Sequence, residues 1–142
     1  MKQSHIATSS TTINAQAAKI WEALTNPETI KQYLFGTNVE TDWKEGSPII
    51  WKGEWQGTEY EDKGTVLKVV PERLLETTYW SSMSGKTDSP ENYNNVKYEL
   101  SEGNAQTIVT ITQDNNPTEE SKKHSEENWN MVLKGLKELL EK

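Results

Sequence analysis

The C-terminal end of the chain carries one long stripe of apolar side chains, which constrains the fold more than any other feature. Apolar residues recur there at helical spacing, and charged residues such as Lys134 and Glu138 fall between them. The stripe consists of Trp129, Val132, Leu133, Leu136, Leu139 and Leu140. This spacing predicts a long amphipathic helix whose apolar side must be buried against another element.

The middle of the chain offers a sheet for that purpose. Short runs of alternating apolar and polar residues, separated by turns that contain Gly, Asn or Pro, predict strands. The expected strands cover residues 4–13, 37–43, 49–55, 60–70, 74–80, 96–100 and 107–114. Consecutive strands joined by short turns favour antiparallel pairing. The facing of strand 74–80 stays open, because both of its sides carry apolar residues.

Two shorter helices are expected between the first two strands. Asn14 is a favourable N-cap for a helix that runs to about Thr25. Asn26 and Pro27 end that helix and begin the next one, with Pro27 at the first helical position. The apolar residues of the two helices are Ala17, Ile20, Trp21, Leu24, Ile30, Tyr33 and Leu34.

These elements predict one α+β domain over residues 1–142. A curved, six- to seven-stranded antiparallel sheet would wrap around the long C-terminal helix, with the two short helices after the first strand. A straight helix cannot fill the concave side of such a sheet evenly, so we expect a cavity between them. The polar segment 81–92 is rich in turn residues and predicts a mobile loop that could cover this cavity.

Three segments resemble a known family. They are residues 20–28 (IWEALTNPE) continuing to Gly36, residues 42–46 (DWKEG) continuing through 64–66 and 69–74, and residues 128–141. In this order they resemble the START-like (SRPBCC, helix-grip) superfamily, and within it the branch named for the activator of heat-shock protein 90 ATPase. The resemblance implies a helix-grip fold. Relatives include co-chaperone domains, carriers of lipids and hormones, aromatase/cyclases and proteins that sequester toxic small molecules.

Charge and composition exclude several classes of function. The formal net charge is -7, which disfavours a nucleic-acid partner because phosphate binding needs concentrated Lys and Arg. No apolar run approaches the ~20 residues that span a bilayer, so we expect no membrane insertion. The chain has no cysteine and no apolar signal core at its start, and we expect a cytoplasmic location. The sequence leaves open a monomer or a homodimer.

Residues typical of catalysis or metal binding are scarce. His5 and His124 are the two histidines, and both fall on polar segments, where we expect solvated side chains. No P-loop, dinucleotide-binding or nucleophile-elbow motif occurs. Glu54 and Glu76 would gain a raised pKa if either pointed inward, and alternation does not decide this. The sequence therefore assigns no catalytic residue, no metal and no cofactor.

Aromatic residues are the better candidates for a site. Six Trp and five Tyr stand in an otherwise polar chain, and large rings with one polar atom suit an amphipathic or aromatic ligand. The candidate cavity residues are Tyr33, Trp51, Trp55, Tyr79, Trp80, Tyr98, Trp129 and Leu133. We therefore expect a small domain that binds a hydrophobic or aromatic small molecule, or a lipid, between sheet and helix.

Two other functions stay open. The resemblance implies that the chain could be a co-chaperone-like module that binds a chaperone and stimulates its ATPase. It also implies that a cyclase- or hydrolase-type enzyme could use the same cavity, since cyclase relatives act by folding a reactive ligand in a shaped pocket. A carboxylate that faces the cavity beside a Tyr hydroxyl would favour the enzyme.

Overall fold

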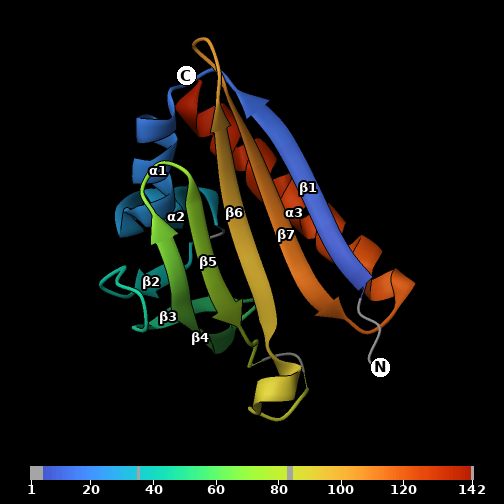
Figure 1. Cartoon of the computed structure of the whole chain (residues 1–142). Coiled ribbons are helices and arrows are strands. Elements are labelled where there is room, and N and C mark those ends of the chain that lie inside the picture. The colour runs from blue at the N-terminus through green and yellow to red at the C-terminus, as the bar shows by residue number, and fades with distance from the viewer. Residues whose placement is uncertain (1–4, 35, 83–84, 142) are drawn as a thin grey trace.

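A computed structural model describes residues 5–34, 36–82 and 85–141. For Trp55 it describes the backbone but not the side chain. One seven-stranded antiparallel sheet forms the body of the molecule, in the order β1-β7-β6-β5-β4-β3-β2 (Figure 1). The strands are β1 (His5–Ile13), β2 (Asn38–Glu40), β3 (Pro48–Trp55), β4 (Thr58–Val70), β5 (Leu74–Tyr79), β6 (Asn94–Glu102) and β7 (Thr107–Asn116). The helices are α1 (Ala17–Thr25), α2 (Pro27–Tyr33), the short 3-10 helix η1 (Pro90–Asn92) and α3 (Glu119–Leu140). This is the helix-grip fold that the sequence predicts.

Strand β4 makes the sheet bend. Its first half pairs with β3 up to Thr65, and its second half pairs with β5 from Val66 onward. A register shift between Val66 and Lys68 leaves the side chain of Leu67 pointing to solvent. Gly64 lies just before this shift, where a Cβ atom would come 1.8 Å from the carbonyl oxygen of Thr78. The bend therefore needs glycine at position 64, because two backbones approach too closely for any side chain.

Helix α3 packs across one face of the sheet along β1 and β7 (Figure 1). Its apolar stripe is buried as predicted, with Leu133 and Leu136 at most 2 % exposed. The facing strand residues Ile13, Val109 and Ile111 are equally buried. These side chains form the core of the molecule, and the alternation along β1 and β7 turns Ser and Thr, together with the exposed Ile6 and Ile108, to the opposite face.

Polar side chains of α3 also cover the free edge of β1. The backbone N–H of Thr8 donates to Glu126 (3.0 Å), and Lys137 donates to the backbone carbonyl of Thr12 (2.7 Å). Just after the strand, the N–H of Asn14 donates to Glu141 (2.8 Å). An edge strand presents unpaired backbone groups that can recruit another chain, and here the helix satisfies several of them.

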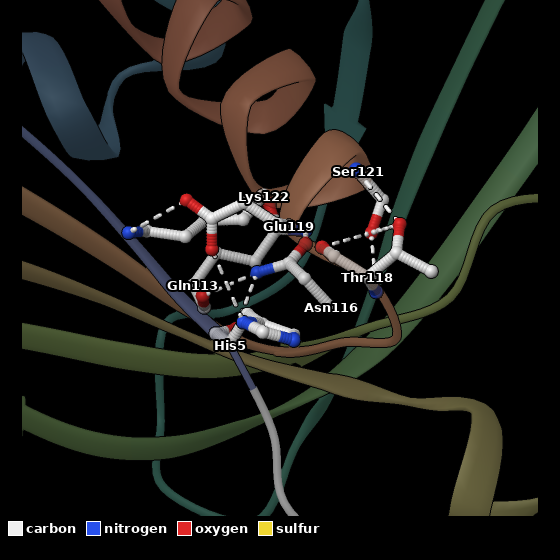
Figure 2. Close-up of polar contacts among 7 residues, drawn as sticks. All are labelled: His5, Gln113, Asn116, Thr118, Glu119, Ser121 and Lys122. Carbon is white, nitrogen blue, oxygen red and sulfur yellow. Dashed lines mark hydrogen bonds and ion pairs between the residues drawn. The ribbon is translucent and has the colours of Figure 1, made fainter.

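A polar network fixes the start of α3 to both neighbouring strands (Figure 2). Thr118 and Ser121 form a capping box, in which each side chain hydrogen-bonds the backbone of the other residue. The Asn116 amide donates to the carbonyl of His5 (2.9 Å), and the His5 ring lies 3.4 Å from Glu119. These contacts fix the direction of α3 relative to β1 and β7, and this direction determines which strand residues its apolar stripe meets.

Several local expectations differ from the structure. Strand β2 ends at Glu40 rather than near Trp43. Helix α1 begins at Ala17, and its first free N–H donates to Glu102 (2.9 Å) on β6 instead of to an Asn14 cap. No helix within the described ranges is both long and apolar enough to span a bilayer.

Candidate functional site

A small apolar pocket lies where α2 and the loop after β2 meet the concave face of the sheet. Its volume is about 20 Å³, roughly the space of one water molecule. The lining residues are Leu24, Ile30, Tyr33, Leu34, Trp43, Ile49, Trp51, Leu75, Thr77, Tyr98 and Val132. The interior between helix and sheet is thus nearly filled in this conformation, whereas the sequence predicted a roomier space.

Alternation along three strands builds the sheet wall of the pocket. Residues two apart on a strand point to the same side, so Ile49 and Trp51 of β3 both face it. Leu75 and Thr77 of β5 do the same, and Tyr98 of β6 lies directly beside Leu75 in the ladder. This settles the facing of β5, whose apolar inner side is that of Leu75 and Thr77.

Helix α2 supplies the opposite wall. Asn26 caps this helix by accepting from the N–H of Glu28 (3.0 Å), as the sequence predicts for the Asn-Pro start. The cap orients Ile30 and Tyr33 inward, and the Tyr33 hydroxyl donates to the carbonyl of Ala23 (3.1 Å). Burial raises the pKa of Tyr33 well above its ordinary value of 10.0. Tyr33 is therefore a neutral, fixed part of the wall.

Tyr98 supplies the polar group that faces the pocket. Burial raises the pKa of its hydroxyl far above 10.0, so the hydroxyl stays protonated. The buried side-chain polar atom that lacks a partner among the described residues is Trp80 Nε1, so the Tyr98 hydroxyl is not sealed in the interior without a partner. A ligand with one polar atom could hydrogen-bond this hydroxyl.

The candidate residues divide into those at the pocket and those near it. Tyr33, Trp51 and Tyr98 line the pocket. Trp129 packs edge-on against Tyr98 with ring centroids 5.9 Å apart, and Leu133 is buried in the core one turn further along α3. These two residues support the wall without lining it.

The remaining candidates lie further away. Tyr79 packs edge-on against Trp51 with centroids 5.2 Å apart, and so stands behind the wall. Trp80 follows Tyr79, and alternation turns it to the opposite face, where it stacks on Tyr93. Trp80 is therefore not a pocket residue, although it is half-buried and its ring nitrogen is buried without a partner among the described residues. The side chain of Trp55 lies outside the described part of the chain.

Two pocket residues that the sequence interpretation missed form its outer rim. Trp43 lies in the loop between β2 and β3, and Leu34 is the last residue of the α2 turn. Both side chains are half-buried. Trp43 and buried Val39 are separated by an even number of residues, so an extended chain would turn both side chains to the same side. This alternation was the signal that could have identified Trp43. Leu34 follows Ile30 at helical spacing.

The loop after β5 is anchored away from this pocket. None of its described residues lines the cavity in this conformation. Lys63 and Tyr93 both contact the carboxylate of Asp88 in this loop, and Asn92 donates to the carbonyl of Thr87 (2.9 Å). Its position at the far end of the sheet is clear in Figure 1, where η1 lies opposite α1.

A buried carboxylate lies close behind the pocket wall. Asp62 is 7 % exposed and accepts hydrogen bonds from the Tyr79 hydroxyl (2.6 Å) and the Ser82 backbone N–H (3.0 Å). Burial, together with the Asp62 charge, raises the pKa of Tyr79. The sequence interpretation considered Glu54 and Glu76 instead, and both face away from the core.

The histidines are far from the pocket. His5 contacts Glu119, and His124 is exposed on α3. Within the described ranges, no three His, Asp or Glu side chains gather as a metal site would require.

Comparison with known proteins agrees with this architecture. The family model described as "Activator of Hsp90 ATPase homolog 1-like protein" matches residues 14–141. The solution structure of ChR145 from Cytophaga hutchinsonii is 52% identical, with a TM-score of 0.87 over 99% of this chain and 97% of that one. No curated protein sequence matches significantly.

More distant structures share the fold. The Aha1 dimer from Colwellia psychrerythraea is 22% identical, with a TM-score of 0.75 over 96% of both chains. CalU16 from Micromonospora echinospora is 19% identical, with a TM-score of 0.71 over 95% of this chain and 84% of that one. Because the family model covers nearly the whole chain, the protein belongs to the family of proteins like activator of Hsp90 ATPase homologue 1.

Proposed function

We propose that this protein binds a hydrophobic or aromatic small molecule in the pocket between α2, α3 and the concave face of the sheet. The observation that carries the proposal is the lining, which combines aliphatic side chains with the rings of Trp51, Tyr33 and Tyr98, two of which carry a hydroxyl. Ligand sites commonly combine an apolar wall with a few polar groups that fix orientation. Membership of the family is compatible with a small ligand-binding domain.

Binding requires the pocket to open. A volume of about 20 Å³ holds no organic ligand, so one wall must move outward. The sheet wall is tied by strand pairing on β3, β5 and β6, whereas the outer wall consists of a seven-residue helix and a loop. Short elements with few backbone partners open at the lowest cost in free energy. The outer wall is therefore the part that yields.

A ligand screen tests the proposal. Wild-type protein is mixed with a set of aromatic and lipid-like compounds, and binding is followed by tryptophan fluorescence and native mass spectrometry. We expect at least one saturable one-to-one complex. Tyr98→Phe should weaken a ligand that carries a polar atom by about tenfold, the value of one hydrogen bond. Tyr93→Phe, outside the pocket, is the matched control and should leave affinity unchanged.

Failure of every compound to bind saturably would contradict the proposal. An equal loss of affinity in the Tyr98 and Tyr93 variants would place the ligand elsewhere.

A second function is favoured by the family match itself. The family is named for an activator of a chaperone ATPase, so the domain could bind such a chaperone directly. A pull-down and an ATPase assay with the Hsp90-type chaperone of the same organism test this. Stimulation of the ATPase would support it, and the absence of both binding and stimulation would remove it.

A further inference from the structure

Trp43, on the pocket rim, has an unusual backbone conformation. Its φ is 61°, in the left-handed region that bulky residues rarely adopt. The four other non-glycine residues with positive φ are Gln56, Glu72, Ala105 and Asn115, which lie in hairpin turns or at a strand end. Trp43 lies in the longer loop that joins the paired strands β2 and β3, where the Asp42 side chain spans it by accepting from the N–H of Lys44. Local hydrogen bonds of this loop therefore hold its backbone conformation.

Local hydrogen bonds hold the backbone around Trp43. Its N–H lies 3.4 Å from the Thr41 hydroxyl, and the N–H of Lys44 donates to Asp42 (3.0 Å). Hydrogen bonds from Ser47 and from the Lys44 backbone lower the pKa of Asp42. The loop is thus braced on both sides of Trp43.

The indole of Trp43 is held differently from its backbone. It packs against the core beside Leu34 and lines the pocket, and its ring nitrogen has no hydrogen-bond partner among the described residues. Trp129, in contrast, donates its ring N–H to Gln113 (2.8 Å). The Trp43 ring can therefore leave its place without breaking a hydrogen bond to another described residue, while the loop hydrogen bonds keep the backbone in position.

We propose that the Trp43 indole fills part of the ligand-binding site when no ligand is bound. We further propose that the natural ligand is a planar aromatic compound of one or two fused rings, which displaces this indole. This inference rests on the function proposed above and names the ligand class. The space gained is the flat volume of an indole added to the existing pocket. Trp51, Tyr33 and Tyr98 remain as its ring walls. A flat slot bounded by rings favours an aromatic ligand over a flexible acyl chain.

Fluorine NMR tests the displacement in the wild-type protein. The chain has six tryptophans, so fluorotryptophan labelling gives six resonances, and Trp43→Phe assigns one of them. Naphthol is titrated as the aromatic probe and decanoate as the acyl probe. Trp21→Phe and Trp80→Phe assign two more resonances. We expect naphthol to shift the Trp43 resonance saturably and to shift those of Trp21 and Trp80 little. We expect decanoate to bind at least about tenfold more weakly.

The outcomes separate this inference from the function on which it rests. Saturable naphthol binding with an unmoved Trp43 resonance would overturn displacement and leave ligand binding intact. Tighter binding of decanoate than of naphthol would overturn the ligand class. Failure of both probes to bind would overturn displacement by this class, and failure of the whole ligand screen would also remove the proposed function.

A pair of glycine variants gives an independent test. Trp43→Gly vacates the rim and accepts the positive φ, so naphthol should bind about tenfold more tightly than to the wild type. Gln56→Gly is the matched control, because it relieves a φ of 52° at the turn between β3 and β4, away from the pocket. Its affinity should equal that of the wild type. Equal affinities in all three proteins would overturn the proposal, with circular dichroism confirming that each is folded.

Discussion

The buried carboxylate of Asp62 affects both the stability of the fold and the position of a pocket-wall residue. Its carboxylate forms no ion pair within the described ranges and depends on donors from Tyr79 and Ser82. A buried charge is costly unless hydrogen bonds compensate for lost hydration. Here the Asp62 carboxylate also fixes Tyr79 by accepting from its hydroxyl, and the Tyr79 ring supports Trp51 in the pocket wall. The stability of this corner and the shape of the pocket are therefore linked through one side chain.

Replacement of Asp62 by Ala should destabilise the protein by about 2 kcal/mol, because the Tyr79 hydroxyl and the Ser82 N–H lose their acceptor while buried. Urea unfolding measures this loss. Tyr79→Phe removes only one donor and should cost about half as much. A loss below about 0.5 kcal/mol for the Asp62 variant would show that water replaces the carboxylate.

The same substitution should have opposite effects at two glycines. Gly64→Ala should destabilise by about 2–3 kcal/mol, because the new Cβ meets a backbone oxygen that cannot move aside. Gly135→Ala should stabilise by about 0.5–1 kcal/mol, since Gly135 lies within α3 and its Cβ would meet Tyr33 only at 3.6 Å or more. Thermal unfolding of both variants checks the contrast, which a uniform destabilisation would contradict.

At the scale of elements, α3 both fills the concave face and closes an edge. Its apolar stripe packs on the sheet, while Glu126, Lys137 and Glu141 bind backbone groups of β1 and of the residue after it. A helix that runs beside an edge strand can satisfy groups which would otherwise pair with another chain.

Replacement of Glu126 and Lys137 together by Ala should expose the β1 edge and speed self-association on mild heating. Light scattering and sedimentation velocity measure this. The matched control is the double replacement of Lys134 and Glu138 by Ala, which removes one charge of each sign from the solvent side of α3. Equal aggregation of the two double variants would show that the edge is protected by other means.

The elements were largely predictable from sequence, and the site was not. Periodicity located the strands and helices, because burial on one face leaves a repeating pattern. The cap of α1 could not be predicted, since Glu102 lies 85 positions away from Ala17 and reaches it only in the folded state. The pocket rim was missed for a related reason. Strand β2 ends at Glu40, so Trp43 lies in the loop beyond it, where the alternation that it shares with Val39 is only a weak guide to side-chain direction.

For the whole molecule, three tyrosines with raised pKa values set an upper limit on pH stability. Burial raises the pKa of Tyr33, Tyr79 and Tyr98 above 10.0. The folded state therefore binds protons more tightly than the unfolded state does, and the resulting stabilisation is complete below the unfolded pKa. It is lost as the pH rises above about 10.

We expect alkaline unfolding to coincide with tyrosine ionisation. Circular dichroism and phenolate absorbance recorded together should change in one step above about pH 10 for these three residues. Tyr98→Phe removes one ionisable group and should move the transition to higher pH. Ionisation of all the tyrosines well before the loss of secondary structure would contradict the argument.

The division of β4 between two ladders has one more consequence. Ile49 and Trp51 come from the part of the sheet before the register shift at Leu67, whereas Leu75 and Tyr98 come from the part beyond it. The register shift therefore lies between the two halves of the sheet that form the pocket wall. A change at outward-pointing Leu67 could alter the spacing of those halves, and with it the pocket volume, without altering any residue that lines the pocket.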